Sequence, residues 1–409
     1  METLYPRCAG LDVHKKTVVA CRRIVLQGKV HEDVQSFATT TRGLLELLDW
    51  LQEADCTVVA MEATGSYWKP VWHVLEGHFK LVLANAGHIR NVPGRKTDVK
   101  DATWIAQLMA HGLIRNSFVP PAPIMDLRDL TRTRKQLVRE VVQHKQRIQR
   151  ILEDCNIKLS SVISDVLGTS GRAILEALVA GESNPKRLAE LGHPRLQCKR
   201  ETLEEALEGR ARPHHRFLLK QHLRMIDSLQ DSIRQIEEQV EAVLPPFRIA
   251  HELLLTIPGV ETTSAQAILA EIGADMSYFP SAGDLRSWAT ICPRSDETAG
   301  KRRSSRMRKG GNWLKPVLIQ CAWAASRQKG TYLQAQFLRV KSRQGPKKAA
   351  GALAASILTA AYFMLRDGVP YRDLGPDHFV KRDRAKVAQK LASRLRNLGY
   401  EVQIHEQVA

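Results

Sequence analysis

The stretch CAGLDVHKKTVVACRRIV, residues 8–25, decides the fold of the N-terminal region. It holds two β-rich runs around a polar turn near His14 to Lys16, which is typical of two paired strands. A third strand is expected at 29–39. The other expected elements are strands at 56–62 and 80–86 and helices at 41–54, 65–78 and 97–112. Short strands that alternate with helices predict an α/β domain.

The chain of 409 residues is too long for one ordinary core and indicates several domains. The segment VPPAP at 119–123 is expected to end the α/β domain, which we place at 1–122. Beyond it we expect a helical coiled-coil region at 123–250, a mostly helical C-terminal domain at 251–372 and a tail at 373–409.

The central region contains two heptad-like segments, in which Arg134, His144 and His222 are polar exceptions. Their apolar a and d positions are Leu127, Leu130, Leu137, Val141, Ile148, Ile151 and Cys155 in the first, and Leu219, Ile226, Leu229, Ile233, Ile236, Val240 and Val243 in the second. The period predicts a coiled-coil pair, antiparallel within one chain or formed between protomers. The pair either dimerises or holds nucleic acid, or it is an internal spacer.

The charge balance points to a polyanionic partner. Lys and Arg number 61 against 43 Asp and Glu, a net charge of +18, and residues 301–366 contain fifteen cations and no acid. This favours nucleic acid over a plain basic surface. Seven scattered cysteines without a CxxC pair fit a reducing cytoplasm. The apolar run 349–365 favours a buried helix over a membrane span.

Four acids of the first domain are candidate metal ligands. Asp12 lies in the first strand and Glu62 ends the strand at 56–62, where a buried acid is unfavourable unless a cation pairs with it. Asp98 and Asp101 are three residues apart on an expected helix, so their charges repel each other. Magnesium prefers such oxygen ligands, and four carboxylates could hold two ions. Singly, each acid also has a structural explanation, and whether His14 joins the site stays open.

The C-terminal half contains two candidate phosphate sites. Residues 297–315, ETAGKRRSSRMRKGGNWLK, combine Lys and Arg with hydroxyls and glycines. Residues 253–273, LLLTIPGVETTSAQAILAEIG, have the helix, turn and helix of a helix-hairpin-helix, whose turn at Gly259 would face a phosphate. The alternative is an ordinary helical hairpin in which Gly259 is a C-cap.

These motifs resemble, in residue type and order, a known family. GLDVHK, MEATGSYW and KTDVKDA resemble the RuvC-like DEDD domain of a large class of bacterial insertion-sequence transposases. IPGVETTSAQAILAEIG, FPSAGDLRSWATICP, AGKRR and KGGNWL resemble their C-terminal domain. The resemblance covers nearly the whole chain. It implies an RNase H-like fold for the first domain and Asp12, Glu62, Asp98 and Asp101 as catalytic ligands of Mg²⁺, with two ions expected.

The resemblance also implies a mechanism and partners. The DEDD site and a nucleophilic serine of the C-terminal domain would form a composite centre on DNA, guided by a structured non-coding bridge RNA, in a dimer or tetramer assembled through the coiled coil. The resemblance implies a bacterial cytoplasmic protein associated with the nucleoid, with no membrane involved. It implies that the serine attacks a DNA phosphate and becomes covalently linked to the DNA, and that strand exchange follows.

This chain departs from the family at the nucleophile, because Thr298 stands where the family has serine. Threonine can attack phosphorus, although its β-branch restricts the side chain; Ser295, Ser304 and Ser305 are alternatives. In a further interpretation the hydroxyls only bind phosphate. The expected nucleic-acid contacts are Lys301, Arg302, Arg303, Ser304, Ser305, Arg306, Arg308, Lys309 and Gly259.

Three functions are therefore open. The first is an RNA-guided, magnesium-dependent DNA recombinase with a covalent hydroxyl nucleophile. The second is a metal-dependent junction endonuclease that uses activated water, which Thr298 keeps open. The third is a non-catalytic nucleic-acid-binding relic of a transposase, which predicts the loss of DEDD acids; all four are present.

Overall fold

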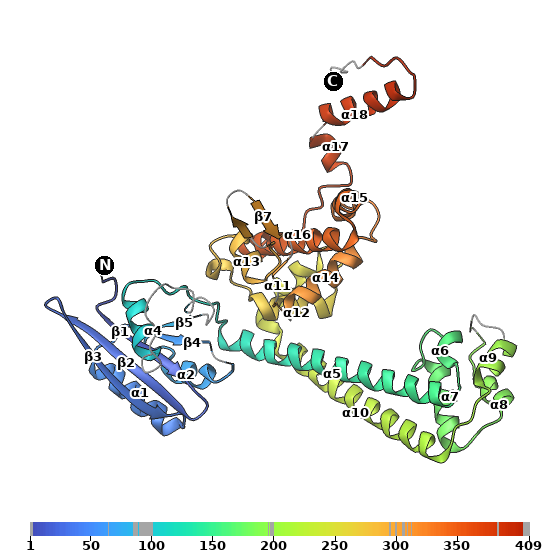
Figure 1. The fold of residues 1–409 in the computed structure, drawn as a ribbon, viewed down its shortest axis with the longest axis horizontal. Helices are drawn as coiled ribbons and strands as arrows, with labels where there is room; N and C mark the ends of the chain where they lie inside the picture. The colour runs from blue at the N-terminus through green and yellow to red at the C-terminus, as the bar shows by residue number, and fades with distance from the viewer. Residues whose placement is uncertain are drawn as a thin grey trace. The chain divides into compact units, whose positions relative to one another are not determined.

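A computed structural model describes most of the chain, which forms two compact units, Met1–Val119 and Pro120–Ala409 (Figure 1). The two units are considered separately below. The described residues are 3–403 apart from 64, 85–88, 90–100, 195, 197–199, 294, 295, 299, 300, 305, 306, 309, 312 and 383.

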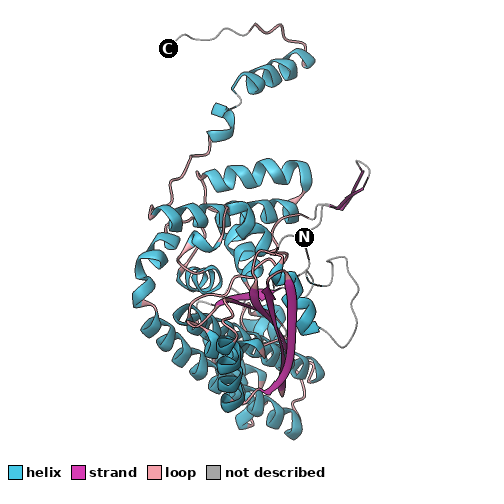
Figure 2. Ribbon diagram, turned by 90° about the vertical axis from the view of Figure 1, so that its left-hand side faces the viewer, coloured by secondary structure: helices cyan, strands magenta, loops and turns pink. Residues whose placement is uncertain are grey.

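The first unit contains a mixed five-stranded sheet in the order β3-β2-β1-β4-β5 (Figure 2). β1 (Arg7–Val13), β2 (Thr17–Leu26) and β3 (Lys29–Ala38) form an antiparallel meander. β4 (Val58–Glu62) and β5 (Lys80–Ala84) continue the sheet in parallel with β1. The α/β class and the five expected strands are confirmed, and the strand order is that of an RNase H-like domain.

Helices cover both faces of this sheet. Side chains alternate between the two faces of a strand, so odd and even residues of β1 enter different cores. Leu11 packs with residues of α1 (Thr41–Glu53) and α2 (Trp68–Leu75), whereas Cys8 packs with α4 (Asp101–Ala110). The expected helix at 97–112 is described from Asp101 onward, and residues 97–100 lie outside the described residues.

The second unit begins with a long arm. α5 (Ala122–Asp154) and α10 (Pro213–Val243) pack side by side in opposite directions within the chain (Figure 1). The predicted coiled-coil pair is therefore formed inside one chain. Its most buried predicted seam residues are Leu127, Ile148, Leu219, Ile226 and Val240. At the tip, a small core is formed with α6 (Leu159–Val162), α7 (Thr169–Ala180), α8 (Pro185–Glu190) and α9 (Arg200–Leu207).

The rest of the second unit is a helical body around α16 (Pro346–Asp367). By length and composition α16 is the one described helix that could cross a membrane, but 56% of its apolar window is buried in the protein. It therefore packs as a core helix, as expected. The other elements are η1 (Pro245–Phe247), α11 (Arg248–Leu255), α12 (Thr262–Ile272), η2 (Met276–Tyr278), α13 (Ala282–Trp288), α14 (Leu314–Ala325) and α15 (Tyr332–Gln344), then α17 (His378–Arg382) and α18 (Arg384–Asn397) in the tail.

A two-stranded hairpin projects from the helical body (Figure 2). It consists of β6 (Asp296–Thr298) and β7 (Lys301–Ser304), which pair antiparallel. The basic segment therefore begins as a β-hairpin.

Candidate active site and nucleic-acid interface

Two of the predicted metal ligands lie at the same end of two neighbouring strands. Asp12 is the last but one residue of β1, and Glu62 is the last residue of β4. The strands are parallel, and Leu11 lies opposite Met61. The following residues of the two strands, Asp12 and Glu62, are therefore neighbours across the sheet. Because side chains alternate along both strands, the two acids point to one face of the sheet.

A glycine in β1 brings the third acid to this face. A Cβ atom at Gly10 would lie 2.3 Å from the carbonyl oxygen of Ala102, so the backbone of α4 rests directly on the strand. Cys8, two residues earlier in β1, contacts the carbonyl of Ala106 at 3.5 Å. The helix thus runs opposite to β1. Its first residue, Asp101, lies toward the strand end that carries the two acids.

Asp12 has a second polar neighbour, which sequence reasoning left open. The Nε2 atom of His14 lies 3.1 Å from Oδ2 of Asp12. The Asp12 side chain is 19% exposed, whereas that of His14 is 56% exposed. The carboxylate is therefore accessible from one side while the imidazole covers another, a geometry in which the histidine orients the carboxylate.

The described acids fit a divalent cation in donor type and placement. Asp12, Glu62 and Asp101 supply hard carboxylate oxygens, are all partly exposed, and lie toward one end of a single sheet face. Among the described residues, these three do not form a closed cluster with all ligand atoms within 4.8 Å of one another. The fourth predicted ligand, Asp98, lies outside the described residues.

A tighter polar cluster, which the sequence did not reveal, lies at the arm tip. The ligand atoms of Asp154, His214 and His215 are within 4.8 Å of one another. Nδ1 of buried His215 accepts a hydrogen bond from the backbone amide of Arg212 at 3.3 Å, which leaves the proton on Nε2, 2.8 Å from the Asp154 carboxylate. Cys155 Sγ lies 3.1 Å from Nδ1. With both ring nitrogens engaged, His215 caps α10 and ties it to α5.

The helix-hairpin-helix pattern does form a helix, a turn and a helix, α11 to α12. Gly259 has φ of +83°. A Cβ atom there would lie 2.5 Å from the backbone nitrogen of Ala325 and 2.6 Å from the carbonyl oxygen of Cys321. The glycine therefore lets the turn pack against α14. It is not the C-cap that the structural alternative predicts, because α11 ends at Leu255 and its C-cap is Thr256. The contact of Gly259 with nucleic acid stays a prediction.

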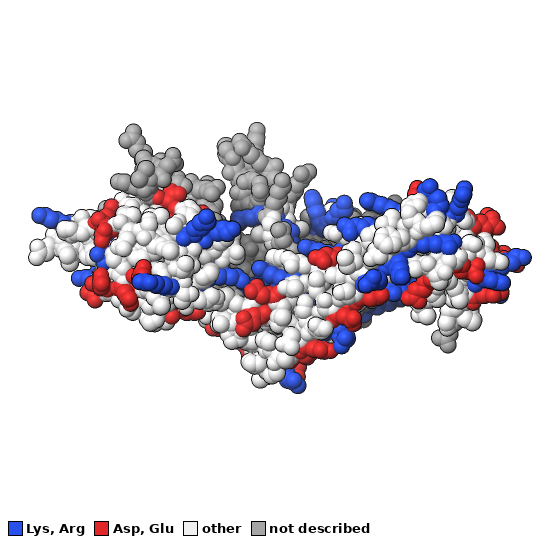
Figure 3. All heavy atoms as spheres, turned by 90° about the horizontal axis from the view of Figure 1, so that it is seen from below, with Lys and Arg blue, Asp and Glu red and all other residues white. Residues whose placement is uncertain are grey.

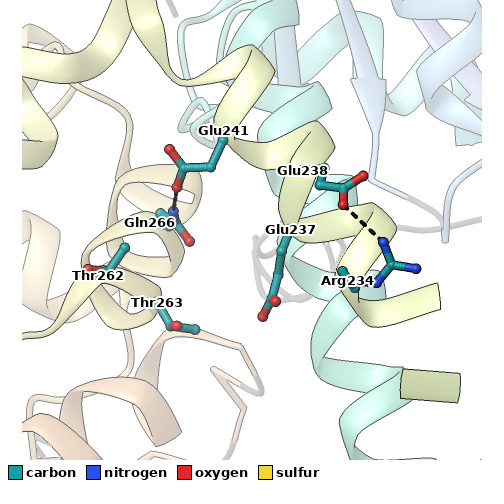
Figure 4. Close-up of a pocket in the computed structure, with 7 residues that line it drawn as sticks. All are labelled: Arg234, Glu237, Glu238, Glu241, Thr262, Thr263 and Gln266. Atoms are coloured by element: carbon teal, nitrogen blue, oxygen red, sulfur yellow. Dashed lines mark hydrogen bonds and ion pairs between the residues drawn. The ribbon is translucent and has the colours of Figure 1, made fainter. Parts of the chain in front are cut away.

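The N-terminal end of α12 faces acidic side chains. A pocket of about 560 Å³ beside it is lined by Thr262, Thr263, Gln266, Arg234, Glu237, Glu238 and Glu241 (Figure 4). Glu241 accepts a hydrogen bond from Gln266 at 2.7 Å, and Glu238 pairs with Arg234. Three carboxylates beside the helix end oppose the approach of a phosphate. This end of the helical hairpin is therefore unfavourable for contact with the phosphate backbone of a nucleic acid.

The β6–β7 hairpin separates the candidate nucleophiles. Thr298 pairs with Lys301 directly beside the turn, whereas Ser304 pairs with Asp296 at the other end of the hairpin. Only the backbone of these strands is described here. Ser295, Ser305, Arg306 and Lys309 lie outside the described residues, and Arg308 is exposed.

The segment after the hairpin is held by lysines. Lys315 donates to the carbonyl of Arg308 at 2.6 Å and to that of Gly310 at 3.3 Å. Lys135 of α5 donates to the carbonyl of Trp313 at 3.0 Å. The Trp313 ring also contacts the side-chain cations of Arg132, Lys135 and Arg139, at 5.2, 5.8 and 5.6 Å from its centroid. These contacts attach the end of the basic segment to the base of the arm.

A buried ion pair fixes the arm to the helical body. Glu271 is 5% exposed, and its two carboxylate oxygens accept from Arg132 at 2.7 and 2.8 Å. Arg128 donates to the carbonyls of Ala270 and Glu271 and so caps the C-terminus of α12. Burial lowers the pKa of Arg128 to about 10, which leaves it charged at neutral pH. No local pattern in the sequence predicts that Arg132 pairs with Glu271.

Comparisons with known proteins agree with the architecture. Residues 9–157 match the model of a transposase DEDD domain of the IS110 type, and residues 251–338 match that described as "Transposase IS116/IS110/IS902 family". Together the matches cover more than half of the chain.

Two curated proteins are similar over most of their length. The uncharacterised 43.6 kDa protein of insertion element IS110 from Streptomyces coelicolor is 25% identical over 69% of this chain and 74% of its own. The Sinorhizobium fredii protein y4pF/y4sB, named as a candidate transposase, is 24% identical over 80% of this chain and 77% of its own. The chain belongs to the IS116/IS110/IS902 family of transposases.

Proposed function

We propose that this transposase mobilises its insertion element by magnesium-dependent cleavage and exchange of DNA strands, guided by a structured RNA. Membership of the family makes the chain a DNA phosphoryl-transfer enzyme, and its DEDD domain implies the use of a divalent metal. The observation that supports the proposal most directly is the convergence of Asp12, Glu62 and Asp101 toward one end of one sheet face.

In this proposal the four acids Asp12, Glu62, Asp98 and Asp101 hold two Mg²⁺ ions. Bound Mg²⁺ neutralises charge on the phosphate oxygens and stabilises the attacking and leaving oxygens. The chain's own contribution is the placement of the ligands. Gly10 lets α4 approach β1, and His14 orients the Asp12 carboxylate, so Asp12, Glu62 and Asp101 are held toward one end of the sheet face before a metal binds.

The nucleophile is the hydroxyl of Thr298. Its oxygen bonds to phosphorus, the bond from phosphorus to one deoxyribose oxygen breaks, and the proton released by the hydroxyl ends on that leaving oxygen. The product is a phosphothreonine link to one DNA end and a free deoxyribose hydroxyl on the other. Lys301 is the backbone partner of Thr298 across the hairpin, and in this proposal its charge stabilises the attacked phosphate.

The basic segment binds the phosphate backbone, and the rest of the complex is assembled around it. Lys301, Arg302, Arg303, Ser304, Ser305, Arg306, Arg308 and Lys309 supply the contacts in this proposal. A structured non-coding RNA of the element pairs with donor and target DNA, and two or four copies of the chain associate through the arm in the cytoplasm. The division into four parts at 122, 250 and 372 likewise stays a prediction.

A single gel tests the proposal. The purified protein is incubated with Mg²⁺, the element's non-coding RNA and labelled donor DNA, and a denaturing gel is examined for DNA linked to protein. Asp12→Asn should abolish cleavage, and Thr298→Val should abolish the adduct. An adduct that survives Thr298→Val but is lost in Ser304→Ala/Ser305→Ala would move the nucleophile to the other end of the hairpin.

The same gel separates the alternatives. Cleaved DNA without any adduct would favour the junction endonuclease, in which metal-activated water attacks. Binding of DNA and RNA without cleavage would favour the non-catalytic relic. In either case the covalent mechanism would be wrong.

A further inference from the structure

We propose that the turn between α15 and α16 is a docking surface for the phosphodiester backbone of duplex DNA, separate from the hairpin segment at 301–309. This inference rests on the proposed function, because it concerns how the same enzyme holds its polyanionic partner. The turn surface consists of the exposed side chains Arg339, Lys341, Arg343, Lys347 and Lys348.

The fold presents these cations together. α15 ends at Gln344, Gly345 reverses the chain with φ of +82°, and α16 starts at Pro346. The two helices pack along each other, so the last turns of α15 and the first turn of α16 are neighbours. The five side chains therefore project from one end of a helical hairpin.

Four of the five cations of the turn surface have no acidic partner among the described residues. Lys341, Arg343, Lys347 and Lys348 form no ion pair with any carboxylate in the described part of the chain, and residues 301–366 contain no acid at all. Arg343 instead donates to the backbone carbonyl of Arg339 at 3.3 Å. Like charges this close repel one another, and an anionic partner removes that repulsion.

The start of α16 adds to the unfavourable charge, whereas Lys341 and Arg343 in the last turn of α15 are favourably placed. A helix N-terminus carries a partial positive charge, and cations in the first turn are unfavourable there. α16 nevertheless has Lys347 and Lys348 in its first turn and no acid. This local conflict lowers the stability of the isolated fold and is relieved when phosphates bind, which is a signature of a functional surface.

Many cations of the arm, unlike four of the five cations of the turn surface, are paired with acids. Its cations are matched by acids, as in Lys145 with Asp165, Lys158 with Glu153, Arg172 with Asp227, Arg200 with Glu190, and Arg234 with Glu238. Figure 3 shows Lys and Arg interspersed with Asp and Glu along the arm. Its charges largely neutralise one another, so the unbalanced charge of the second unit lies elsewhere, at the turn surface and the hairpin segment.

The turn surface is rigid and adjoins the hairpin segment. Ala349 and Ala350 at the start of α16 are 1% exposed, so the helix end that carries the lysines is anchored in the core. One turn further, a Cβ atom at Gly351 would lie 3.2 Å from Cε of Met307. The hairpin segment holds the attacked DNA phosphate in the proposed function, so the occupant of the neighbouring turn surface is the same duplex DNA.

The chemistry of the surface selects phosphates and not bases. Long Lys and Arg side chains on a convex helical turn contact a backbone by charge and give no sequence readout. DNA and RNA share this backbone, and the following experiment distinguishes them.

The test compares two variants with equal loss of charge. The turn variant is Lys341→Gln/Arg343→Gln/Lys347→Gln/Lys348→Gln, and the arm variant is Lys145→Gln/Lys158→Gln/Arg200→Gln/Arg234→Gln. Dissociation constants are measured for a random-sequence duplex DNA and a random single-stranded RNA over a range of salt concentrations, with thermal melting as the check of folding.

For duplex DNA, the slope of log Kd against log salt should fall in the turn variant by about 3 to 4, at ~0.9 per phosphate. A fall of about 3 with single-stranded RNA, and none with duplex DNA, would overturn the assignment to DNA. The arm variant should keep nearly the wild-type slope. Equal slopes in the two variants would overturn the proposal, as would wild-type protein that binds neither probe.

The outcome is independent of the adduct assay. Wild-type protein that binds with the expected slopes but forms no adduct would contradict the covalent mechanism and leave the turn surface standing. Adduct formation with equal slopes in both variants would support the covalent mechanism and contradict the turn surface.

Discussion

Replacing Gly10 by alanine should damage the fold and the metal site together. The added methyl group would lie 2.3 Å from the carbonyl oxygen of Ala102 and 2.4 Å from the backbone nitrogen of Ala106. Both atoms belong to the backbone of α4, so no side-chain rotation relieves the overlap. Ordinary contact requires about 3.4 Å, and α4 must therefore move by about 1 Å.

This displacement sets the size of both effects. Overpacking a close-packed core typically costs about 1–3 kcal/mol. For a unit of this length that corresponds to a fall in Tm of roughly 4 to 12 °C. Asp101 moves with the first turn of α4, and a misplacement of about 1 Å in an active site can lower a rate by about 100-fold. Gly10→Ala should thus be folded at low temperature but nearly inactive.

Two measurements decide the matter, the thermal midpoint followed by circular dichroism and the rate of DNA cleavage at a temperature where the variant is fully folded. Gly28→Asn is the matched control, because Gly28 lies in the β2–β3 turn with φ of +78° and nothing lies within 4 Å of an added Cβ. Asparagine tolerates this conformation. If Gly10→Ala melted and cleaved like the control, the account of how α4 is placed would be wrong.

Three further results are expected. Glu271→Gln should lower the free energy of unfolding by about 3–5 kcal/mol in denaturant melts, because it leaves buried arginines uncompensated, whereas the exposed Glu238→Gln should change it by less than about 1 kcal/mol. Burial lowers the pKa of His144 and His222, whose Nδ1 atoms lie 3.0 Å apart. Protonation therefore favours the unfolded arm, so melts between pH 7.5 and 5 should show stability lost as pH falls below 6.5, and the loss should shrink in His222→Phe. Gly259→Ala should melt earlier without any nucleic acid present, and an unchanged midpoint would contradict its packing against α14.

The first unit was largely predictable because its signals are local. Strand alternation and turn residues around Asp12 and Glu62 identify the strands, and the ends of parallel strands meet at one edge of a sheet. The contribution of Gly10 was missed, although a glycine inside a strand is a known sign of close backbone approach. What the glycine approaches is α4, more than ninety residues later, and a sequence pattern does not carry that information.

The second unit was predictable in its helices but not in their contacts. The heptads predicted the two long helices of the arm but left open whether they pair within one chain or between protomers. In the structure they pair within the chain. The ion pair of Arg132 with Glu271 joins residues 139 apart, and both types are ordinary on a helix surface. The hairpin at Gly259 matched its motif locally, yet acids contributed by α10 face the start of α12. The charges that surround a motif depend on the fold. The helix-hairpin-helix pattern alone therefore predicted a phosphate contact without accounting for these acids.

The register that makes Asp12 and Glu62 neighbours on one face of the sheet restricts where insertions and deletions can occur. Alternation has a period of two, so adding or removing a single residue within β1 or β4 before the acid would turn that carboxylate to the opposite face of the sheet. Length changes in the β2–β3 turn, or between α1 and β4, leave this relation intact. We therefore expect the two strands to tolerate no change in length while the connections around them vary freely.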